Sequence, residues 1–240
     1  SYVKKYNEAV MAIDEGVGRI VTALEASGQL ENTIIVFASD QGFAWGQHGL
    51  RGKIEPYDSN IRGPLIVANS KRFPQGKTCD HPINGADVVR TFHSLAGVNP
   101  GIQLDGRDFS KLLIQPNHDT SWTDEPMLQT YSCNNYDNAA IVDSIKNKNW
   151  EKLRYGGKKD AKLKPAYLML HDGRYKYIRY IGKDYMEELY DMQKDPDEFV
   201  NLAVKPERRA QLESLRSKTA TAFRNKGAEF IDILPPPTTK

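Results

Sequence analysis

The sequence has few cysteines, no long apolar run and almost no net charge, and each shortage excludes a class of protein. Its two cysteines match no C-x-x-C metal or redox spacing, so one disulfide and two free thiols both stay open. The longest strongly apolar runs, residues 34–38 and 65–68, fall far short of the ~20 residues that a membrane-spanning helix requires. The 33 basic and 31 acidic side chains leave a formal charge of +2, which gives no general case for nucleic-acid binding. We therefore expect neither a membrane span nor a nucleic-acid partner.

What the chain does have is enough apolar sequence for a globular fold. At 240 residues, of which 39% are hydrophobic, it can bury a sizeable core. It opens on S-Y-V-K-K-Y, which is neither an initiator methionine nor a secretion signal. We therefore expect a soluble globular protein whose sequence is not a complete translation product.

Residues 1–120 show the pattern of an α/β fold. Apolar residues at helical spacing predict a helix over about 3–27. Continuous apolar runs at 33–39 and 64–68 predict strands that are covered on both faces, and a second helix is expected near 86–96. Helices that alternate with buried strands favour a mostly parallel sheet flanked by helices.

Residues 121–240 follow a different pattern. Alternating runs at 167–171 and 174–180 flank an Asp-Gly pair, which is a strong hairpin signal. A third short strand is expected at 188–192, and a helix that begins with a proline is expected at 206–225. This half is therefore predicted to be a small antiparallel-sheet subdomain with a C-terminal helix.

The stretch A-S-D-Q-G-F-A-W-G-Q-H-G-L-R-G-K gathers polar groups directly after the first buried strand. In an open α/β sheet, ligands bind beyond the carboxyl ends of the strands, and Asp40 and Gln41 lie at such an end. Their oxygens are hard ligands suited to calcium or magnesium, and Lys53 could hold an oxyanion against the metal. Taken singly, an aspartate such as Asp40 is more often the cap of a turn, and a lysine such as Lys53 is more often a solvated loop residue. Whether they have a functional role therefore depends on the motifs that accompany them.

Three segments of the chain together resemble the sulfatase family of the alkaline-phosphatase superfamily. They read N-T-I-I-V-F-A-S-D-Q-G, then G-Q-H-G-L-R-G-K, then Y-D-S-N-I-R-G-P-L-I-V. The family has a strand that ends in S-D-[NH]-G, followed by G-E-H-G-L-x-G-K and Y-E-x-x-I-R-V-P-L-I-V. Residues 14–19, 104–107, 173–178 and 188–198 are also similar to family segments, and residues 115–165 are the least similar. The resemblance implies the C-terminal part of a sulfatase fold.

The resemblance also implies roles for single residues. Asp40 matches a family metal ligand, and Gln41 stands where the family has Asn or His, which is also a ligand. Lys53 matches the lysine that contacts the sulfate oxygens, as a catalytic and substrate-binding group. His48 and Arg51 are expected near the substrate, with His48 acting in catalysis by contact with the ester or its sugar. For Arg62, which opens the second strand, we prefer a structural role, because such arginines commonly pair with an acid at a sheet end.

The expected metal follows from the ligand atoms at these positions. An amide at position 41 offers oxygen where a histidine would offer nitrogen, and oxygen-only sites favour calcium and magnesium over softer transition metals. Gln is one methylene longer than Asn, and the flexible shell of calcium tolerates this change better than the near-octahedral shell of magnesium. We therefore expect Ca²⁺, with Mg²⁺ as the alternative.

The nucleophile motif of the family does not occur in this sequence. Family sulfatases act through a formylglycine made from the Cys or Ser of C/S-x-P/A-x-R. Cys79 begins C-D-H-P-I and Cys133 begins C-N-N-Y-D, and neither fits. The formylglycine and the paired aspartates of the metal site are therefore expected in an upstream N-terminal part of the same enzyme, and we expect this chain alone to be inactive.

Three functions stay open from the sequence. The first is a sulfatase that acts on a sulfated carbohydrate; the second is a phosphonate monoester or phosphodiester hydrolase of the same superfamily; the third is a non-catalytic binding module. The resemblance implies a secreted, periplasmic or lysosomal protein. Two surfaces could meet a sulfated sugar, although plain loops explain each as well or better: the basic stretch 146–164, and a polar, aromatic loop formed by Tyr131, Cys133, Asn134, Asn135 and Tyr136.

Overall fold

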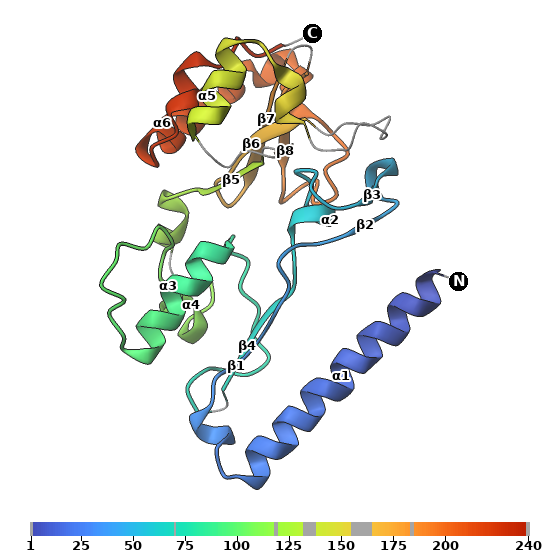
Figure 1. Cartoon of the computed structure of the whole chain (residues 1–240), viewed down its shortest axis with the longest axis vertical. Coiled ribbons are helices and arrows are strands. Elements are labelled where there is room, and N and C mark those ends of the chain that lie inside the picture. The colour runs from blue at the N-terminus through green and yellow to red at the C-terminus, as the bar shows by residue number, and fades with distance from the viewer. Residues whose placement is uncertain are drawn as a thin grey trace.

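The computed structural model describes residues 2–69, 71–117, 120–131, 138–154, 165–182 and 185–238. Two parts stand end to end along the long axis of the molecule (Figure 1). The N-terminal part holds α1, β1 to β4 and α2 to α4, and the C-terminal part is built on the sheet that contains β5 to β8. The small antiparallel sheet that was expected in the C-terminal half is present, and the division at 120/121 stays a prediction.

The N-terminal part begins with the long helix α1 (Tyr2–Ala26), as predicted. The 3-10 turn η1 (Leu30–Asn32) leads into β1 (Ile35–Ala38), and β1 pairs with β4 (Leu65–Ala68). Both strands were predicted, but their pairing is antiparallel, whereas a mostly parallel sheet was expected. Parallel neighbours need a long crossover, usually a helix. The connection between these strands holds only short elements: β2 (Ala44–Trp45), η2 (Gln47–Gly49), β3 (Arg51–Gly52) and α2 (Asp58–Ile61).

The rest of the N-terminal part contains α3 (Gly85–Ala96) and α4 (Ser110–Ile114), and a group of polar contacts holds it together. The Asp87 carboxylate accepts hydrogen bonds from the backbone and guanidinium of Arg107, whose guanidinium lies 3.9 Å from the centre of the Trp122 ring. A Cβ at Gly106 would lie 2.0 Å from the Ala86 carbonyl oxygen, so only glycine permits this approach. The L-D-G-R segment therefore joins α3 to the 3-10 turn η3 (Thr120–Asp124).

The C-terminal part is a four-stranded antiparallel sheet in the order β5-β6-β7-β8. The predicted hairpin and third strand are present, and the edge strand β5 was not predicted. Helix α6 was predicted together with the proline turn η6 that precedes it, and α5 was not. The elements are β5 (Met127–Tyr131), α5 (Asn138–Lys146), η4 (Trp150–Leu153), β6 (Ala166–His171), β7 (Tyr175–Ile181), β8 (Glu188–Asp191), η5 (Leu202–Val204), η6 (Pro206–Arg208), α6 (Arg209–Asn225) and η7 (Glu229–Ile233).

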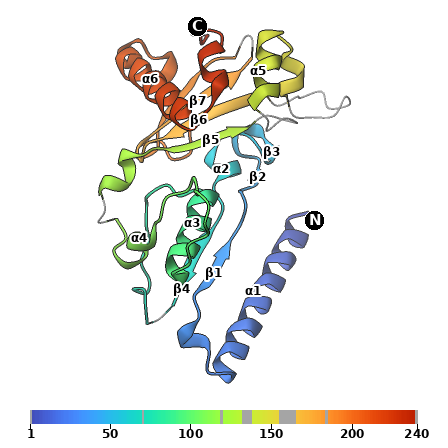
Figure 2. The same cartoon turned by 60° about the vertical axis from the view of Figure 1, so that its left-hand side comes forward.

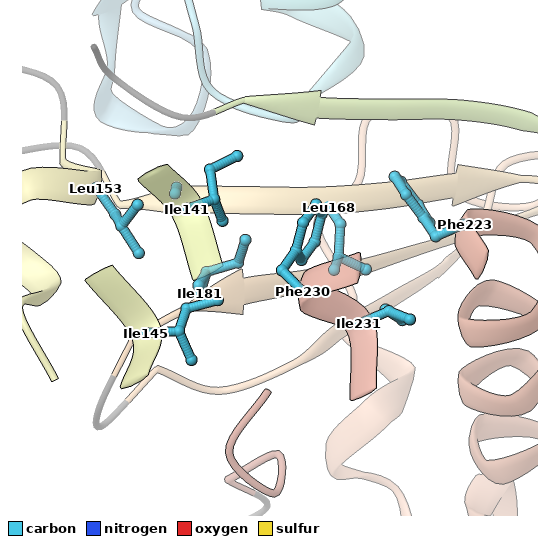
Figure 3. Close-up of a cluster of buried hydrophobic side chains, with 9 residues drawn as sticks. Ile141, Ile145, Leu153, Leu168, Ile181, Phe223, Phe230 and Ile231 are labelled. Carbon is cyan, nitrogen blue, oxygen red and sulfur yellow. The ribbon is translucent and has the colours of Figure 1, made fainter. Parts of the chain in front are cut away.

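The main hydrophobic core lies between this sheet and the elements that cover one of its faces. Figure 3 shows side chains from α5, β6, β7, α6 and η7 that converge on one cluster. Burial of large apolar side chains contributes about 1.5–3 kcal/mol each, so this cluster is a main source of stability for the part. Its buried members are Ile141, Ile145, Leu153, Ala166, Leu168, Ile181, Phe223, Phe230 and Ile231.

The N-terminal part keeps much of its apolar surface uncovered. Helix α1 has no buried residue, and its Ile20 side chain is 60% exposed. Ile66 on β4 is 59% exposed, although β4 was predicted to be covered on both faces. Figure 2 shows α1 on one side of β1, and α3 and α4 on the other. None of the helices in the described segments has the length and apolarity needed to cross a membrane.

Candidate active site

The first group of site residues follows the end of β1. The Ser39 hydroxyl donates to the Gln41 carbonyl oxygen at 2.9 Å and approaches Asp40 Oδ1 at 3.5 Å. Gln41 Nε2 donates to Asp40 Oδ2 at 3.2 Å. The two predicted metal ligands therefore touch each other, and the exposed Asp40 carboxylate is open to solvent.

Two glycines bring this strand end directly against the segment that leads into β4. A Cβ at Gly42 would lie 2.7 Å from the Ser59 carbonyl oxygen and 2.8 Å from that of Arg62. A Cβ at Gly63 would lie 2.8 Å from the Ser39 carbonyl oxygen. These contacts are shorter than a side chain permits, so the close approach depends on glycine at both positions.

Lys53 follows directly after the small hairpin formed by β2 and β3. Its side chain is exposed, and the next residue, Ile54, has a φ of 103°. That value is an outlier for a β-branched residue, because Cβ crowds the backbone in this region. The chain therefore turns sharply at Lys53, and the surrounding contacts hold it there.

The other side of the hairpin faces α1. The Arg51 guanidinium lies 4.4 Å from the centre of the Tyr2 ring, and Trp45 packs on Tyr2 and Tyr6 with ring centres 5.1 and 4.8 Å apart. These contacts join the start of α1 to the hairpin. The predicted role of Arg51 in substrate binding stays a prediction.

His48 lies between the hairpin and the C-terminal part. Its ring stacks on Tyr57 with centres 4.0 Å apart and planes 12° apart, and Phe199 lies 5.7 Å away. Burial lowers the pKa of His48, although a hydrogen bond with the Asp197 backbone opposes the shift. The neutral imidazole is therefore favoured at pH 7. The His48 backbone has a φ of 54°, a left-handed conformation that is uncommon outside glycine.

Tyrosine hydroxyls connect the same segment to the sheet. Tyr57, Tyr180 and Tyr190 all donate to the Glu188 carboxylate, over 3.2, 3.2 and 3.0 Å. Burial raises the pKa of Glu188, and these hydrogen bonds oppose the rise. Because Tyr57 also stacks on His48, strand β8 contacts the candidate site through one intermediate side chain. Nothing in the sequence pattern indicated this connection.

The strand end offers only two of the ligands that the predicted metal site would need. Asp40 and Gln41 supply hard oxygens of the kind that calcium and magnesium prefer. Within the described segments, no three His, Cys, Asp or Glu side chains are grouped so that they could hold a metal ion. Gln41 points its NH₂ group at Asp40, so the amide would have to turn by half a rotation to present oxygen to a cation. These two residues fit a hard cation and need further ligands to complete its shell.

The remaining sequence predictions have mixed outcomes. Arg62 is exposed and forms no ion pair with an acid of the described segments, so the expected pairing is not seen. Tyr131 ends β5 and its ring lies 6.1 Å from that of Tyr167. The other four residues of the predicted sugar-binding loop, 133–136, lie outside the described residues, as does 155–164 of the basic stretch. Cys79 is half-buried with a free thiol.

Comparison with known proteins gives a match to one family model over part of the chain. Residues 1–98 match the family model described as Sulfatase. The chain is 38% identical over 112 residues to an N-acetylglucosamine-6-O-sulfatase of Bacteroides thetaiotaomicron, which is 47% of this chain and 20% of that protein. It is 27% identical over 230 residues to a choline-sulfatase of Rhizobium meliloti, which is 96% of this chain and 38% of that protein.

Solved structures agree with these relatives. One, a protein in complex with its substrate D-glucosamine-2-N,6-O-disulfate, has a TM-score of 0.68 and 26% identity over 90% of this chain and 40% of its own. The phosphonate monoester hydrolase of Agrobacterium radiobacter has a TM-score of 0.66 and 21% identity over 89% of this chain and 39% of its own, a likeness of fold alone. The chain thus spans between a fifth and two fifths of the length of these proteins.

Proposed function

We propose that the protein is a sulfuric ester hydrolase of the sulfatase family that removes sulfate from a sulfated carbohydrate, because residues 1–98 match the Sulfatase family model and the chain is similar to an N-acetylglucosamine-6-O-sulfatase. The observation that carries the proposal is the end of β1, where Asp40 and Gln41, the two residues that the resemblance aligns with family metal ligands, lie in contact. The 38% identity over 112 residues to an N-acetylglucosamine-6-O-sulfatase supports a carbohydrate ester as the substrate class.

The proposed roles follow from charge. A sulfate ester gathers negative charge on its oxygens in the transition state, so fixed positive groups stabilise that state more than the ground state. Lys53 is proposed to contact the non-bridging oxygens, with Asp40 and Gln41 as two oxygen ligands of a calcium ion. When bound, the cation would supply Lewis-acid stabilisation of the same charge. His48 and Arg51 are proposed to contact the ester or its sugar.

The nucleophile is proposed to lie outside this chain. No residue here matches the formylglycine motif, so we propose an upstream N-terminal part of the same enzyme that carries it and completes the metal site. The uncovered apolar side chains of α1 and β4 are consistent with such a partner. The purified chain alone should show no sulfatase turnover, and hydrolysis of an aryl sulfate by this chain without a partner would contradict the assignment.

A phosphonate monoester or phosphodiester hydrolase is the second candidate, because two such enzymes share the fold. The decisive experiment assays the intact protein with matched aryl sulfate, phosphonate monoester and phosphodiester substrates, and then with sulfated sugars. We expect the highest kcat/KM for sulfate esters. A preference for the phosphorus esters would replace the proposal, and a binding module without a nucleophile would hydrolyse none of them.

The proposed compartment is extracytoplasmic: secreted, periplasmic or lysosomal. Two relatives, from Drosophila melanogaster and Caenorhabditis elegans, bear the name extracellular sulfatase. Fractionation of the producing cells with an antibody against the chain tests this, and recovery in the cytosolic fraction would contradict it.

A further inference from the structure

A buried asparagine holds the turn that carries Lys53. The Asn60 side chain, on the short helix α2 that follows this turn, is completely buried. Its Nδ2 donates to the Gly52 carbonyl oxygen at 3.1 Å and to Glu55 Oε2 at 2.7 Å. Its Oδ1 accepts from the Ser59 hydroxyl at 2.8 Å. One amide group therefore bonds to the chain on both sides of Lys53.

The position of these two bonds matters because the turn is strained. Ile54, between Lys53 and Glu55, has a φ of 103°, which a β-branched residue does not adopt without outside support. Strained backbone of this kind persists only where surrounding contacts over-determine it. The two Nδ2 bonds span Ile54, one before it and one after it, and they supply that support.

We propose that Asn60 is a positioning residue for Lys53. Its amide fixes the 52–55 turn and so sets the direction in which the Lys53 ammonium leaves the chain. This inference rests on the proposed function of Lys53 and deepens it. A positive charge stabilises a transition state best when its position is fixed before the reaction begins. A displacement of about 1 Å can lower the rate by about 10²-fold.

The test compares two buried asparagines in the intact protein. Asn60→Asp keeps the shape but places a carboxylate against the Gly52 carbonyl and Glu55. Asn69→Asp is the matched control: Asn69 is also buried, and its Nδ2 donates to the Glu31 and Thr33 carbonyl oxygens at 3.2 and 2.7 Å, at the other end of β4. For an aryl sulfate we expect Asn60→Asp to lower kcat by about 10²-fold, and Asn69→Asp to leave kcat within about 2-fold.

A double-mutant cycle shows whether the effect passes through Lys53. In a Lys53→Ala background, Asn60→Asp should cause almost no further loss of kcat, because the positioned group is already gone. If the loss of kcat in the double variant equals the product of the losses in the two single variants, the proposal is overturned. An equal loss of kcat in Asn69→Asp would also overturn it. If Asn60→Asp does not fold, Glu55→Ala removes one of the two bonds and is expected to lower kcat in the same non-additive way.

Hydrogen exchange separates this inference from the proposed function. Backbone amides of residues 51–55 should exchange faster in Asn60→Asp than in the wild type or Asn69→Asp, whether or not the substrate is a sulfate ester. Unchanged exchange at these amides would show that the Asn60 hydrogen bonds do not hold the turn. Faster exchange in a protein that hydrolyses no sulfate ester would mean that Asn60 holds the turn but that Lys53 has no role in a sulfatase. The positioning proposal would then be refuted as well.

Discussion

Lys176 on β7 is completely buried, and its ammonium lies 2.6 Å from Glu198 Oε1. The same ammonium contacts the Asp58 carboxylate, and Glu198 Oε2 accepts a hydrogen bond from the Asp58 backbone at 2.6 Å. The group thus ties the loop of the candidate site to the C-terminal sheet. Asp58 stands five residues after Lys53, so these contacts connect the C-terminal sheet to the segment that carries Lys53.

The first prediction concerns the stability of this junction. Lys176→Met removes the cation and leaves the Glu198 carboxylate buried without a charge partner, which should cost about 3–5 kcal/mol of unfolding free energy. Denaturant unfolding of the intact protein measures this. The control is Lys218→Met, which breaks an ion pair with Asp172 at 3.6 Å between partly exposed side chains and should cost less than about 1 kcal/mol.

A second substitution makes the reason testable. Adding Glu198→Gln to Lys176→Met removes the uncompensated charge and should restore part of the lost stability. Equal losses for Lys176→Met and Lys218→Met would show that the buried charges do not hold the junction.

Lys176 also shows where sequence reasoning stops. The hairpin around Asp172-Gly173 follows from local alternation and turn chemistry, and the structure confirms it. The same alternation says nothing about which face another part of the chain will cover. Lys176 is buried because residues far away in sequence, Asp58 and Glu198, fold over it. Tertiary contacts of this kind leave no periodic signal.

The N-terminal strands give a similar lesson. The two apolar runs predicted β1 and β4, but not their relative direction, which depends on the path of the connecting segment. The neighbouring positions of Asp40 and Gln41 were predictable because strand ends are where such sheets bind ligands. No motif in this sequence indicates the ligands that would complete a metal shell, and the described segments hold no group of three His, Cys, Asp or Glu side chains that could supply them.

The second prediction concerns pH. Burial, with a smaller contribution from Lys176, lowers the pKa of His171 from 6.5 to about 4. The unfolded state therefore binds more protons than the native state between these pH values, and stability falls as pH decreases through this window. The loss should approach about 1.4 kcal/mol per pH unit, or up to about 3 kcal/mol in total at pH 4.

The variant His171→Gln tests this assignment. Gln keeps an acceptor for the Gly173 backbone N–H, which His171 Nδ1 accepts at 3.0 Å, and it has no charge to gain. The difference in unfolding free energy between variant and wild type should shift in favour of the variant as pH falls from 6.5 to 4. Parallel stability curves over that range would assign the acid sensitivity to other groups.

The third prediction concerns Lys53 itself. Lys53→Ala in the intact protein should lower kcat/KM for a sulfate ester by two orders of magnitude or more, since one preorganised donor contributes ~3 kcal/mol or more to oxyanion stabilisation. The circular dichroism spectrum should not change, because the side chain is exposed. Lys71→Ala, which removes an exposed lysine paired with Glu31, is the control and should retain activity. Near-normal turnover by folded Lys53→Ala would refute the proposed role.

The last prediction concerns the metal and the glutamine that the family pattern does not have. If Gln41 presents its amide oxygen to the ion, Gln41→Asn should retain metal with a modest loss, because the same atom is offered by a side chain one methylene shorter. Gln41→His should gain relative affinity for manganese or zinc, since it replaces oxygen with nitrogen. Metal analysis of the purified intact protein, followed by titration of the stripped protein with each ion, measures both changes. Gln41→Ala should weaken calcium binding, and it also removes the hydrogen bond to Asp40. Native zinc, or calcium affinity unchanged in Gln41→Ala, would mean that Gln41 only orients the Asp40 carboxylate and that other oxygens hold the ion.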